Sequence, residues 1–289
     1  MKKSVDSYHS SALAWHRKAI EVSLDQRSKT LRRVIIDILQ HSSRGHLGSS
    51  FSLIEIIRVL YDEILNLDAN NPLSKDRDRF ILSKGHGCLA LYVLLAEKGF
   101  FEEKELWRFC KYNALLGGHP NSTKIPGVEA STGSLGHGLP IGVGFALNAK
   151  FEKSAHRIFI VLGDGECNEG SVWEAAMCAV KHRLDNLTVI IDYNKYQSYD
   201  TTRAVQDLEP FLNKWESFGF SVSEVNGHDI ESLKEVFSRV PFVNCRPSAV
   251  LCHTVKGKGI SFTENNLEWH HKSRISDAEI KALKDGLAG

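Results

Sequence analysis

Hydrophobic positions recur at helical spacing in the first part of the chain. One helix is predicted around residues 31–39, where the apolar positions are Leu31, Val34, Ile35, Ile38 and Leu39. A second helix is predicted over 52–61, with Ser52 as its N-cap and Glu55 completing a capping box. Residues 80–82 read as a short apolar strand, whereas the polar residues 1–25 predict an arm or a surface helix.

From residue 155 onward the pattern alternates between strands and helices. Apolar strands are predicted over 156–162, 187–192, 220–225 and 248–255. Helices are predicted over 171–182, 208–218 and 229–238, the last capped by Asp229, with a final helix over 277–287. This alternation predicts an α/β fold with a parallel sheet flanked by helices on both faces. We expect residues 1–289 to form a single domain.

Charge and cysteine usage exclude several classes of protein. The chain has 36 Lys and Arg against 35 Asp and Glu, a formal net charge of +1. A surface that follows nucleic-acid phosphates usually has a marked basic excess, so we expect no nucleic-acid partner. No stretch approaches the roughly 20 apolar residues of a membrane span, and we expect no membrane association. Six scattered cysteines without a Cys-x-x-Cys pair suit a reducing cytoplasm and offer no zinc spacing.

The segment Gly163-Asp164-Gly165 directly follows a predicted strand and precedes a helix. Ligands of open parallel sheets bind at the carboxyl ends of the strands, so Asp164 would present a carboxylate there. The next strand runs into Asn194, and the two side chains would meet if the strands are neighbours. Carboxylate and amide oxygens suit Mg²⁺. Gly-Asp-Gly alone is also common as a plain turn, and its pairing with Asn194 makes the metal interpretation more specific.

Five histidines follow a glycine: His46, His86, His119, His137 and His228. A glycine before a histidine indicates a tight loop that presents an imidazole, which carries protons near neutral pH and binds sugar hydroxyls. We assign His228 to structure, because Asp229 behind it caps a helix. The glycine-rich segment 131–138 leads into a helix over 141–151 with further glycines. That helix either packs tightly against another chain or a cofactor, or is a poor helix after a flexible turn.

These residues resemble the transketolase family of thiamine diphosphate enzymes, from about Arg27 to His271. The segment from Gly163 through Asn194 is similar to the thiamine diphosphate fingerprint. In that family its Asp, its Asn and a carbonyl two residues later hold the metal. The resemblance therefore implies metal ligands at Asp164, Asn194 and the backbone of Tyr196, with Mg²⁺, or Ca²⁺ or Mn²⁺ in its place. Tyr193 departs from a fingerprint that often has a second Asn.

Other segments match cofactor and substrate positions of the family. Gly45-His46 through Ser49 resembles a loop whose His touches donor sugar and cofactor, with Ser49 near the diphosphate. His86 corresponds to a diphosphate-binding His, and His119, before Pro120, to a substrate-channel His. The resemblance implies catalytic roles for His46, His86, His119 and His270. It implies cofactor binding by Ser49, His86, Gly133, Ser134, Leu135, Gly165, Glu169, Asn194, Lys256 and His270. His137 stands where full-length transketolases usually have Gln, and its role stays open.

The chain differs from full-length members of the family in length. Those enzymes continue into a pyrimidine-binding domain, which supplies the glutamate that activates the cofactor, and into a C-terminal domain. The chain thus resembles the N-terminal subunit of a split transketolase. This implies transfer of a two-carbon ketol unit from a ketose to an aldose, or their phosphates. It also implies a separate partner subunit that carries the pyrimidine-binding domain, with two copies of each chain in the assembly.

Two alternatives remain open. The α-subunit of a 2-oxo acid dehydrogenase shares the cofactor fingerprint, although the Gly-His-Pro and Trp-His-His segments argue against it. A non-catalytic module that binds thiamine diphosphate is disfavoured by Asp164, Asn194 and the set of histidines. Activity reconstituted with a partner would exclude the non-catalytic module, and lipoamide-dependent turnover of a 2-oxo acid would identify the dehydrogenase.

Overall fold

Five parallel strands form the central sheet in the computed structural model, which describes residues 5–288. The strand order is β1–β2–β3–β5–β4, and every neighbouring pair is parallel. The strands are β1 (Arg79–Leu82), β2 (Ile158–Gly163), β3 (Leu187–Tyr193), β4 (Ser221–Asn226) and β5 (Ser248–His253). The predicted parallel sheet is confirmed, and each observed strand begins and ends within two residues of its predicted range.

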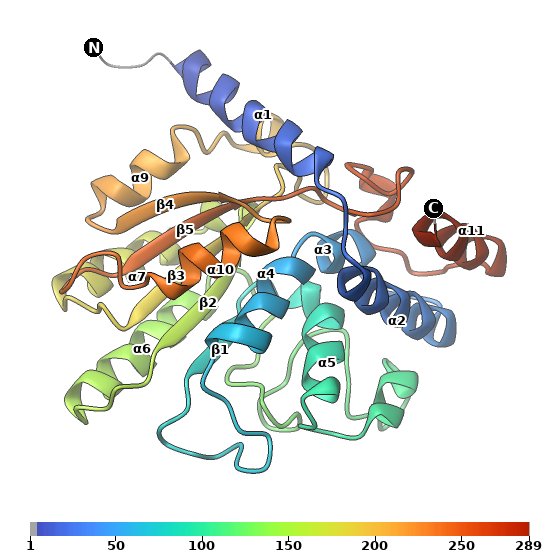
Figure 1. Cartoon of the computed structure of the whole chain (residues 1–289), viewed down its shortest axis with the longest axis horizontal. Helices are drawn as coiled ribbons and strands as arrows, with labels where there is room; N and C mark the ends of the chain where they lie inside the picture. The colour runs from blue at the N-terminus through green and yellow to red at the C-terminus, as the bar shows by residue number, and fades with distance from the viewer. Residues whose placement is uncertain (1–4, 289) are drawn as a thin grey trace.

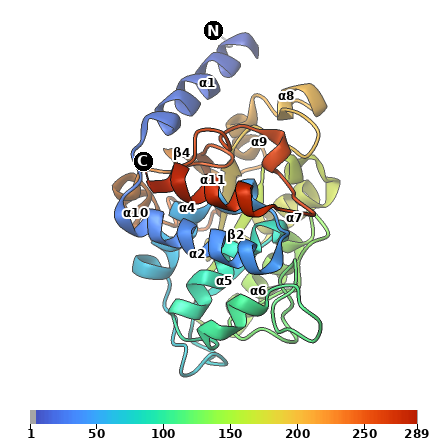
Figure 2. The ribbon, with the colours of Figure 1, turned by 90° about the vertical axis from the view of Figure 1, so that its right-hand side faces the viewer.

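Helices cover both faces of the sheet (Figure 1). One core contains residues of α2 (Gln26–Ser42), α3 (Leu47–Phe51), α4 (Ile54–Val59), α5 (Cys88–Glu97), α10 (Ile230–Ser238) and α11 (Asp277–Ala288). The other contains residues of α1 (Val5–Glu21), α6 (Gly138–Phe151), α7 (Gly170–Lys181) and α9 (Phe211–Ser217). Shorter helical segments are η1 (Leu60–Ile64), η2 (Gly85–Gly87), η3 (Glu103–Arg108), η4 (Gly165–Asn168), α8 (Thr202–Val205) and η5 (Leu267–Trp269). Along the outside of the molecule, α11 lies beside α2 (Figure 2).

The strands divide their side chains between the two cores. In β2, Phe159 and Val161 belong to the core on the α2–α5 side, whereas Ile158, Ile160 and Leu162 belong to the other. A strand covered on both faces buries every side chain, which explains why β2 reads as one continuous apolar run. The alternation leaves the carboxyl ends of the strands as the place where polar side chains gather.

The predicted helices are present, with corrections to two starts and to one cap. The helix expected over 141–151 begins three residues earlier, at Gly138, and the helix expected over 208–218 begins three residues later, at Phe211. The capping box at Ser52 is wrong: α4 begins at Ile54, and Leu53 is its N-cap without a side-chain hydrogen bond. The Ser52 hydroxyl instead donates to Asp192 Oδ2 at 2.6 Å. Glu55 also fails to reach back to the helix start, because its carboxylate binds Arg32 and His228 in the interior.

The predicted arm is a helix that lies along the β4–β5 side of the sheet (Figure 1). The first residues of the range 1–25 lie outside the described residues, and α1 occupies most of the rest. The Trp15 ring stacks on the His253 ring with centroids 5.2 Å apart, and His16 Nδ1 lies 3.1 Å from the Thr254 carbonyl. The helix is therefore docked on β5 and on the loop that follows it.

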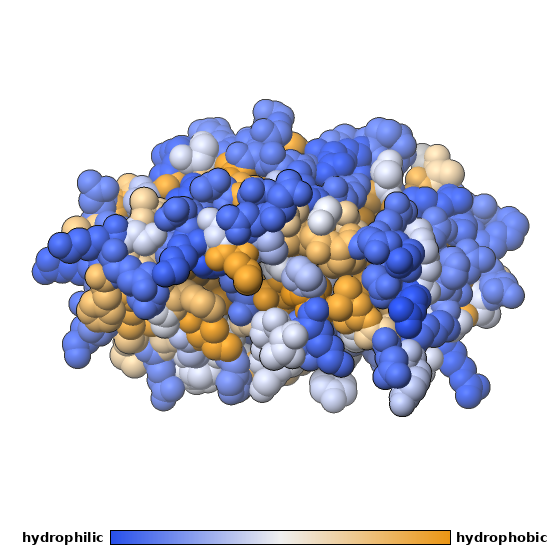
Figure 3. Space-filling view, turned by 90° about the horizontal axis from the view of Figure 1, so that it is seen from below, coloured by the Kyte–Doolittle hydropathy of each residue, from blue (hydrophilic) through white to orange (hydrophobic). Residues whose placement is uncertain are grey.

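The face drawn in Figure 3 is largely hydrophilic, with groups of apolar residues near its middle and on its lower left. Among residues 5–288, we find no helix with the length and apolar character needed to cross a membrane.

Candidate active site

Asp164 and Asn194 lie at the ends of neighbouring strands, as expected. Gly163 of β2 pairs with Asp192 of β3, so the segments that leave the two strands run side by side. Asp164 Oδ2 accepts a hydrogen bond from the Lys195 amide at 2.6 Å. Both Asp164 and Asn194 line one cavity of about 460 Å³ at the carboxyl edge of the sheet. This edge is where open parallel sheets bind ligands.

Most of the expected site residues line this cavity. They are His46, Ser49, His86, Gly133, Leu135, Asp164, Gly165, Glu169, Asn194, Tyr196, Lys256 and His270. Ser134 is exposed and is not part of this lining. His119 lines an adjoining hollow of about 610 Å³, which shares His46 with the first cavity.

Asp192 forms the buried polar centre beneath the cavity. Its carboxylate binds the Lys84 ammonium and accepts hydrogen bonds from the Ser52 and Thr254 hydroxyls. Burial raises the pKa of Asp192, but the Lys84 charge and these hydrogen bonds outweigh burial, and the pKa lies below its usual value. Asp192 is therefore ionised at neutral pH and holds the Lys84 ammonium at the cavity wall.

Asp164 has the opposite shift. Burial and the negative charge of Asp192 raise the pKa of Asp164 to about 6, although the Gly165 and Lys195 amides donate to its oxygens. A cation bound at this carboxylate would compensate both effects, so the site suits a metal ion. Among the described residues, no group of three His, Cys, Asp or Glu side chains could hold a metal. The expected ligand set does not require such a group, because two of its three ligands are an amide oxygen and a backbone carbonyl.

The Tyr196 carbonyl, expected to be a metal ligand, has a partner in this structure. It accepts a hydrogen bond from Lys256 Nζ at 3.1 Å, and the Gln197 carbonyl accepts another at 2.7 Å. A metal ion at Tyr196 would have to displace or share the first of these bonds. Burial lowers the pKa of Lys256 to about 8, while Asp164 acts in the other direction.

Unpartnered polar atoms in the lining indicate that the cavity suits a polar ligand. Asn168 Oδ1, Gln197 Nε2 and His270 Nδ1 are buried without a hydrogen-bond partner, and all three residues line the cavity. Buried polar groups of this kind usually have a partner. A ligand with several donors and acceptors, beside the Lys84 and Lys256 ammonium groups, would satisfy them.

Five imidazoles form a cluster centred on His46, which lines both the cavity and the adjoining hollow. The His46 ring centroid lies 5.6 Å from that of His86, 6.0 Å from His119, 5.8 Å from His270 and 4.4 Å from His271. Burial is the main cause that lowers the pKa of His46 to about 4 and that of His270 to about 3. The His46 and His270 rings are thus neutral at pH 7, and each can accept one proton and donate another.

The loops that carry these rings are packed closely together. A Cβ atom on Gly85 would lie 2.7 Å from the Thr132 hydroxyl, so only glycine allows the loop of His86 to approach segment 131–138. Glu166 ties segment 131–138 to the end of β2 and to the start of the His86 loop, because its buried carboxylate accepts from the Gly136 and Gly163 amides and from the Ser83 hydroxyl. The glycine that precedes His86 thus has a packing reason.

Several residues of the site were not predicted. His271 belongs to the imidazole cluster beside His270, and the sequence Trp-His-His offered both rings. Lys84, Asp192 and Glu166 lie within or next to the predicted motifs, but their contacts depend on the tertiary fold. His228 is buried between Glu55 and the Val255 amide, as its structural assignment requires. His137 is exposed, with its Nδ1 2.9 Å from the Leu135 carbonyl.

The comparisons with known proteins agree with this geometry. The family described as transketolase, thiamine diphosphate binding domain, matches residues 24–288. The chain is 39% identical over 263 residues to a subunit of the apulose-4-phosphate transketolase of Phocaeicola vulgatus, covering 91% of this chain and 93% of that protein. It is 36% identical to the 6-deoxy-6-sulfo-D-fructose transketolase subunit SqwG of a Clostridium species, covering 87% of this chain and 91% of the relative.

Full-length transketolases are similar over part of their length. The chain is 35% identical to the transketolase of Homo sapiens over 93% of this chain and 42% of that protein. The solved transketolase of Campylobacter jejuni has a TM-score of 0.84 at 29% identity, covering 91% of this chain and 42% of that chain. The chain thus spans less than half the length of these enzymes.

The fold and the site define a thiamine diphosphate-binding α/β protein. The chain belongs to the transketolase family and corresponds to its N-terminal, thiamine diphosphate-binding part. This assignment favours a transketolase subunit over the α-subunit of a 2-oxo acid dehydrogenase.

Proposed function

We propose that this chain is the N-terminal subunit of a two-chain transketolase, which transfers a two-carbon ketol unit from a ketose to an aldose, or their phosphates. The observation that carries the proposal is the cavity that joins Asp164 and Asn194 with three rings of the imidazole cluster, His46, His86 and His270, at the carboxyl edge of the sheet. Names of relatives support it, since two of them are transketolase subunits named for a sugar phosphate and a sulfosugar. All six cysteines are free, which suits a cytoplasmic enzyme.

Three groups of this chain would hold the metal. We assign Mg²⁺ to the Asp164 carboxylate, the Asn194 amide oxygen and the Tyr196 carbonyl, with Ca²⁺ or Mn²⁺ able to replace it. The raised pKa of Asp164 supports the assignment, because a neighbouring cation would stabilise its ionised form. The same ion would neutralise charge on the diphosphate.

The remaining lining, together with the exposed Ser134 between Gly133 and Leu135, would hold the organic cofactor. Ser49, His86, Gly165, Asn194, Lys256 and His270 would bind the diphosphate side, and Gly133, Ser134, Leu135 and Glu169 the rest of the molecule. When bound, thiamine diphosphate supplies a carbon nucleophile and an electron sink for the carbon–carbon bond that breaks. The neutral rings of His46, His86, His119 and His270 would orient sugar hydroxyls and exchange protons with them.

The adjoining hollow suits a negatively charged sugar. Its lining contains Arg44, Lys111 and Lys124 together with His119 and His271, and no Asp or Glu. A phosphate or another anionic group on the substrate would therefore meet positive charge close to the imidazole cluster. This feature supports sugar phosphates as substrates.

A partner subunit would complete the site. In the family the activating glutamate belongs to the pyrimidine-binding domain, and the names of relatives, which are themselves single subunits, support its supply by a second chain. We propose two copies of each chain in the assembly, with residues 1–289 acting as one domain. Closed symmetric assemblies of this kind are the commonest.

The experiment is an assay of the purified chain with thiamine diphosphate, Mg²⁺, a panel of ketose donors and aldose acceptors, with and without the partner subunit. We expect turnover only with both chains. Robust turnover by the chain alone would contradict the two-chain proposal. Cofactor binding without sugar turnover in the mixture would favour the non-catalytic module, and lipoamide-dependent 2-oxo acid turnover would favour the dehydrogenase.

A further inference from the structure

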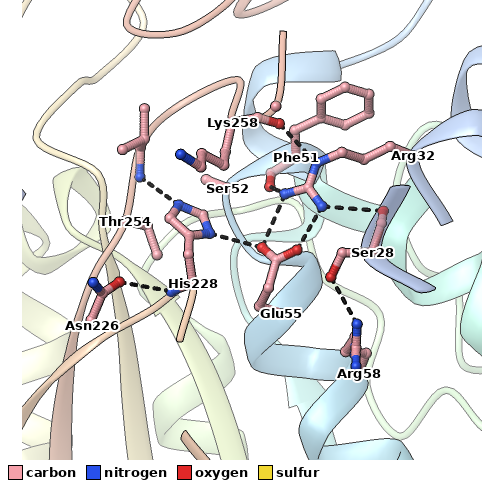
Figure 4. A network of polar contacts seen from close by, with 12 residues as sticks. Ser28, Arg32, Phe51, Ser52, Glu55, Arg58, Asn226, His228, Thr254 and Lys258 are labelled. Atoms are coloured by element: carbon pink, nitrogen blue, oxygen red, sulfur yellow. Dashed lines mark hydrogen bonds and ion pairs between the residues drawn. The ribbon is translucent and has the colours of Figure 1, made fainter. Parts of the chain in front are cut away.

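A buried charged network lies behind the cavity, between α2, α4 and the segment that follows β5. Arg32 of α2, Glu55 of α4 and His228 after β4 are each at most 2% exposed. Arg32 binds both carboxylate oxygens of Glu55, at 2.6 and 3.0 Å, and His228 Nδ1 lies 2.8 Å from Glu55 Oε2 (Figure 4). The cofactor cavity is lined by other residues and not by Arg32, Glu55 or His228.

The network ends on backbone groups at both sides of Lys256. The Val255 amide donates to His228 Nε2 at 2.9 Å, and Arg32 Nε donates to the Lys258 carbonyl at 2.7 Å (Figure 4). The backbone of residues 255–258 is thus held by one side chain before Lys256 and by another after it. The Asn265 amide adds a hydrogen bond to the Lys256 carbonyl at 2.8 Å.

The hydrogen-bond pattern fixes the protonation of the network. Since His228 Nε2 accepts from an amide, the ring proton is on Nδ1 and is donated to Glu55. Burial lowers the pKa of His228 despite the neighbouring carboxylate, which agrees with a neutral ring. Burial alone would raise the pKa of Glu55, but the Arg32 charge and the hydrogen bonds from His228 and Arg32 together outweigh burial, so the pKa lies below its usual value and Glu55 is ionised.

The Lys256 side chain leaves this anchored segment and reaches the cavity. The aliphatic part of the Lys256 side chain packs closely against Gly48, where an added Cβ atom would lie 3.3 Å from Lys256 Cγ. Its ammonium then contacts the Tyr196 and Gln197 carbonyls. A small displacement of the backbone would therefore move the ammonium relative to the proposed metal and diphosphate positions.

We propose that Arg32, Glu55 and His228 are positioning residues for Lys256, and that the network sets where its ammonium stands in the cofactor cavity. The consequence for the cofactor rests on the proposed function, because it requires Lys256 to bind the diphosphate. The position of the ammonium does not depend on that role. Buried ion pairs often add little net stability relative to apolar packing, but they can fix a geometry.

The test compares variants of the full chain that break the network at different points. His228→Leu removes both of the ring's hydrogen bonds, whereas His228→Gln keeps one donor and one acceptor. Glu55→Gln removes the negative charge between Arg32 and His228. It provides a second way to break the network if His228→Leu does not fold. Arg58→Met is the matched control, because Arg58 binds Asp25 and the Ser28 hydroxyl nearby without contacting residues 255–258.

The first measurement is the rate of competitive acetylation of Lys256 by mass spectrometry, relative to the exposed Lys104 in the same sample. We expect His228→Leu and Glu55→Gln to raise the relative rate several-fold, His228→Gln to restore most of the protection, and Arg58→Met to leave it unchanged. Unchanged labelling in His228→Leu and Glu55→Gln, or an equal rise in Arg58→Met, would overturn the proposal.

The second measurement is the affinity for inorganic pyrophosphate with Mg²⁺. We expect His228→Leu to weaken the affinity for pyrophosphate about tenfold, as loss of a residue that supports a ligand-binding side chain often does. In a chain that already carries Lys256→Met, His228→Leu should weaken the affinity no further. If the acetylation rate of Lys256 changes but neither Lys256→Met nor His228→Leu loses affinity for pyrophosphate, the network does position Lys256. In that case the proposed role of Lys256 in binding the diphosphate is wrong. Equal losses from His228→Leu in both backgrounds would overturn the proposal.

Discussion

Two buried carboxyl groups on adjacent segments, Asp164 and Asp192, have opposite roles at the residue scale. Asp192 already has its cation in Lys84, and its pKa is lowered. Asp164 accepts hydrogen bonds from the Gly165 and Lys195 amides, and burial and the charge of Asp192 raise its pKa to about 6, although the Lys84 charge acts in the other direction. Asp192 therefore has a cation in direct contact, whereas no such ion pair is found for Asp164 among the described residues, an arrangement that suits a metal ion at Asp164.

The first prediction concerns Asp164→Ala. The variant should lose metal-dependent binding of thiamine diphosphate, because the ion can no longer bridge the protein and the diphosphate. Isothermal calorimetry on the assembled enzyme with Mg²⁺ measures the loss. Glu152→Ala removes an exposed carboxylate at the end of α6 and should leave the affinity unchanged. Wild-type affinity in Asp164→Ala would refute the ligand assignment.

The second prediction concerns the imidazole cluster. His46→Ala and His270→Ala should each lower turnover by about 10²–10⁴, the usual effect of losing an acid–base or orienting group. Thermal unfolding should change little, since neither ring belongs to a hydrophobic core. His41→Ala, an exposed ring on α2, should retain turnover. Collapse of the fold in His46→Ala or His270→Ala would instead favour a structural role for these rings.

Residue-level prediction from sequence succeeded where a motif fixes both the residue and its place on a strand. Asp164 and Asn194 follow the ends of adjacent strands, so their common cavity could be predicted from the strand pattern alone. Glu166 could not be found in this way, because its partners are amides at Gly136 and Gly163 that only the fold brings together. Ser52 was misread for a related reason, since its hydroxyl serves Asp192 rather than a helix end.

At the scale of elements, α1 and α5 illustrate what periodicity detects. α5 is nearly all buried, so it has no polar stripe and gives no amphipathic signal. α1 has few buried side chains, and its docking depends on individual aromatic and polar contacts such as Trp15 with His253. A pattern of apolar positions therefore predicts neither α5 nor the place where α1 docks.

The third prediction concerns the docking of α1 through His16. Burial, with the charge of Lys195, lowers the pKa of His16 to about 4 in the folded chain, against about 6.5 when unfolded. The unfolded chain binds the proton first on acidification. The contribution of neutral His16 to stability is therefore fully present above about pH 6.5 and is lost as the pH falls towards 4.

His16→Gln should accordingly reduce the slope of unfolding free energy against pH between pH 6.5 and 4. The reduction is at most about 1.4 kcal/mol per pH unit, the value for one proton. Urea unfolding at a series of pH values measures it. His182→Gln, at an exposed ring beyond the end of α7, should keep the wild-type slope. An unchanged slope in His16→Gln would show that α1 docking does not depend on a neutral ring.

At the scale of the whole molecule, the sheet separates two cores, and α6 both packs on the sheet and forms part of the outer surface. A Cβ atom on Gly142 would lie 2.1 Å from Ile160 Cδ1, so this glycine allows α6 to approach β2. Close packing against another chain is therefore unnecessary to explain Gly142. Gly144 differs, because it is exposed and a Cβ atom there would meet nothing within 4 Å.

The exposed side of α6 is a candidate contact surface with another chain. Ile141, one turn before Gly144, is 38% exposed, and Met177 on the neighbouring α7 is 54% exposed. Exposed apolar side chains on adjacent helices, next to a glycine that permits close approach, are typical of an assembly interface. The family resemblance predicts the same, since the glycine-rich helix would face another subunit.

The last prediction is that Gly144→Arg prevents assembly without unfolding the chain. A side chain at this position projects from the outer side of α6 into open space, so the isolated chain can accommodate it. Arginine should even favour the helix over glycine by up to about 1 kcal/mol. Between two closely packed subunits the same guanidinium would be taken out of water, and the larger side chain would hold the two surfaces apart, both of which are costly. Sedimentation velocity of the mixed chains should show smaller particles, with turnover reduced in parallel and the melting temperature of the lone chain maintained. Ser238→Arg, at the end of α10 on the opposite side of the sheet, is the matched control and should assemble normally. Full assembly and activity in Gly144→Arg would show that this side of α6 faces solvent in the working enzyme.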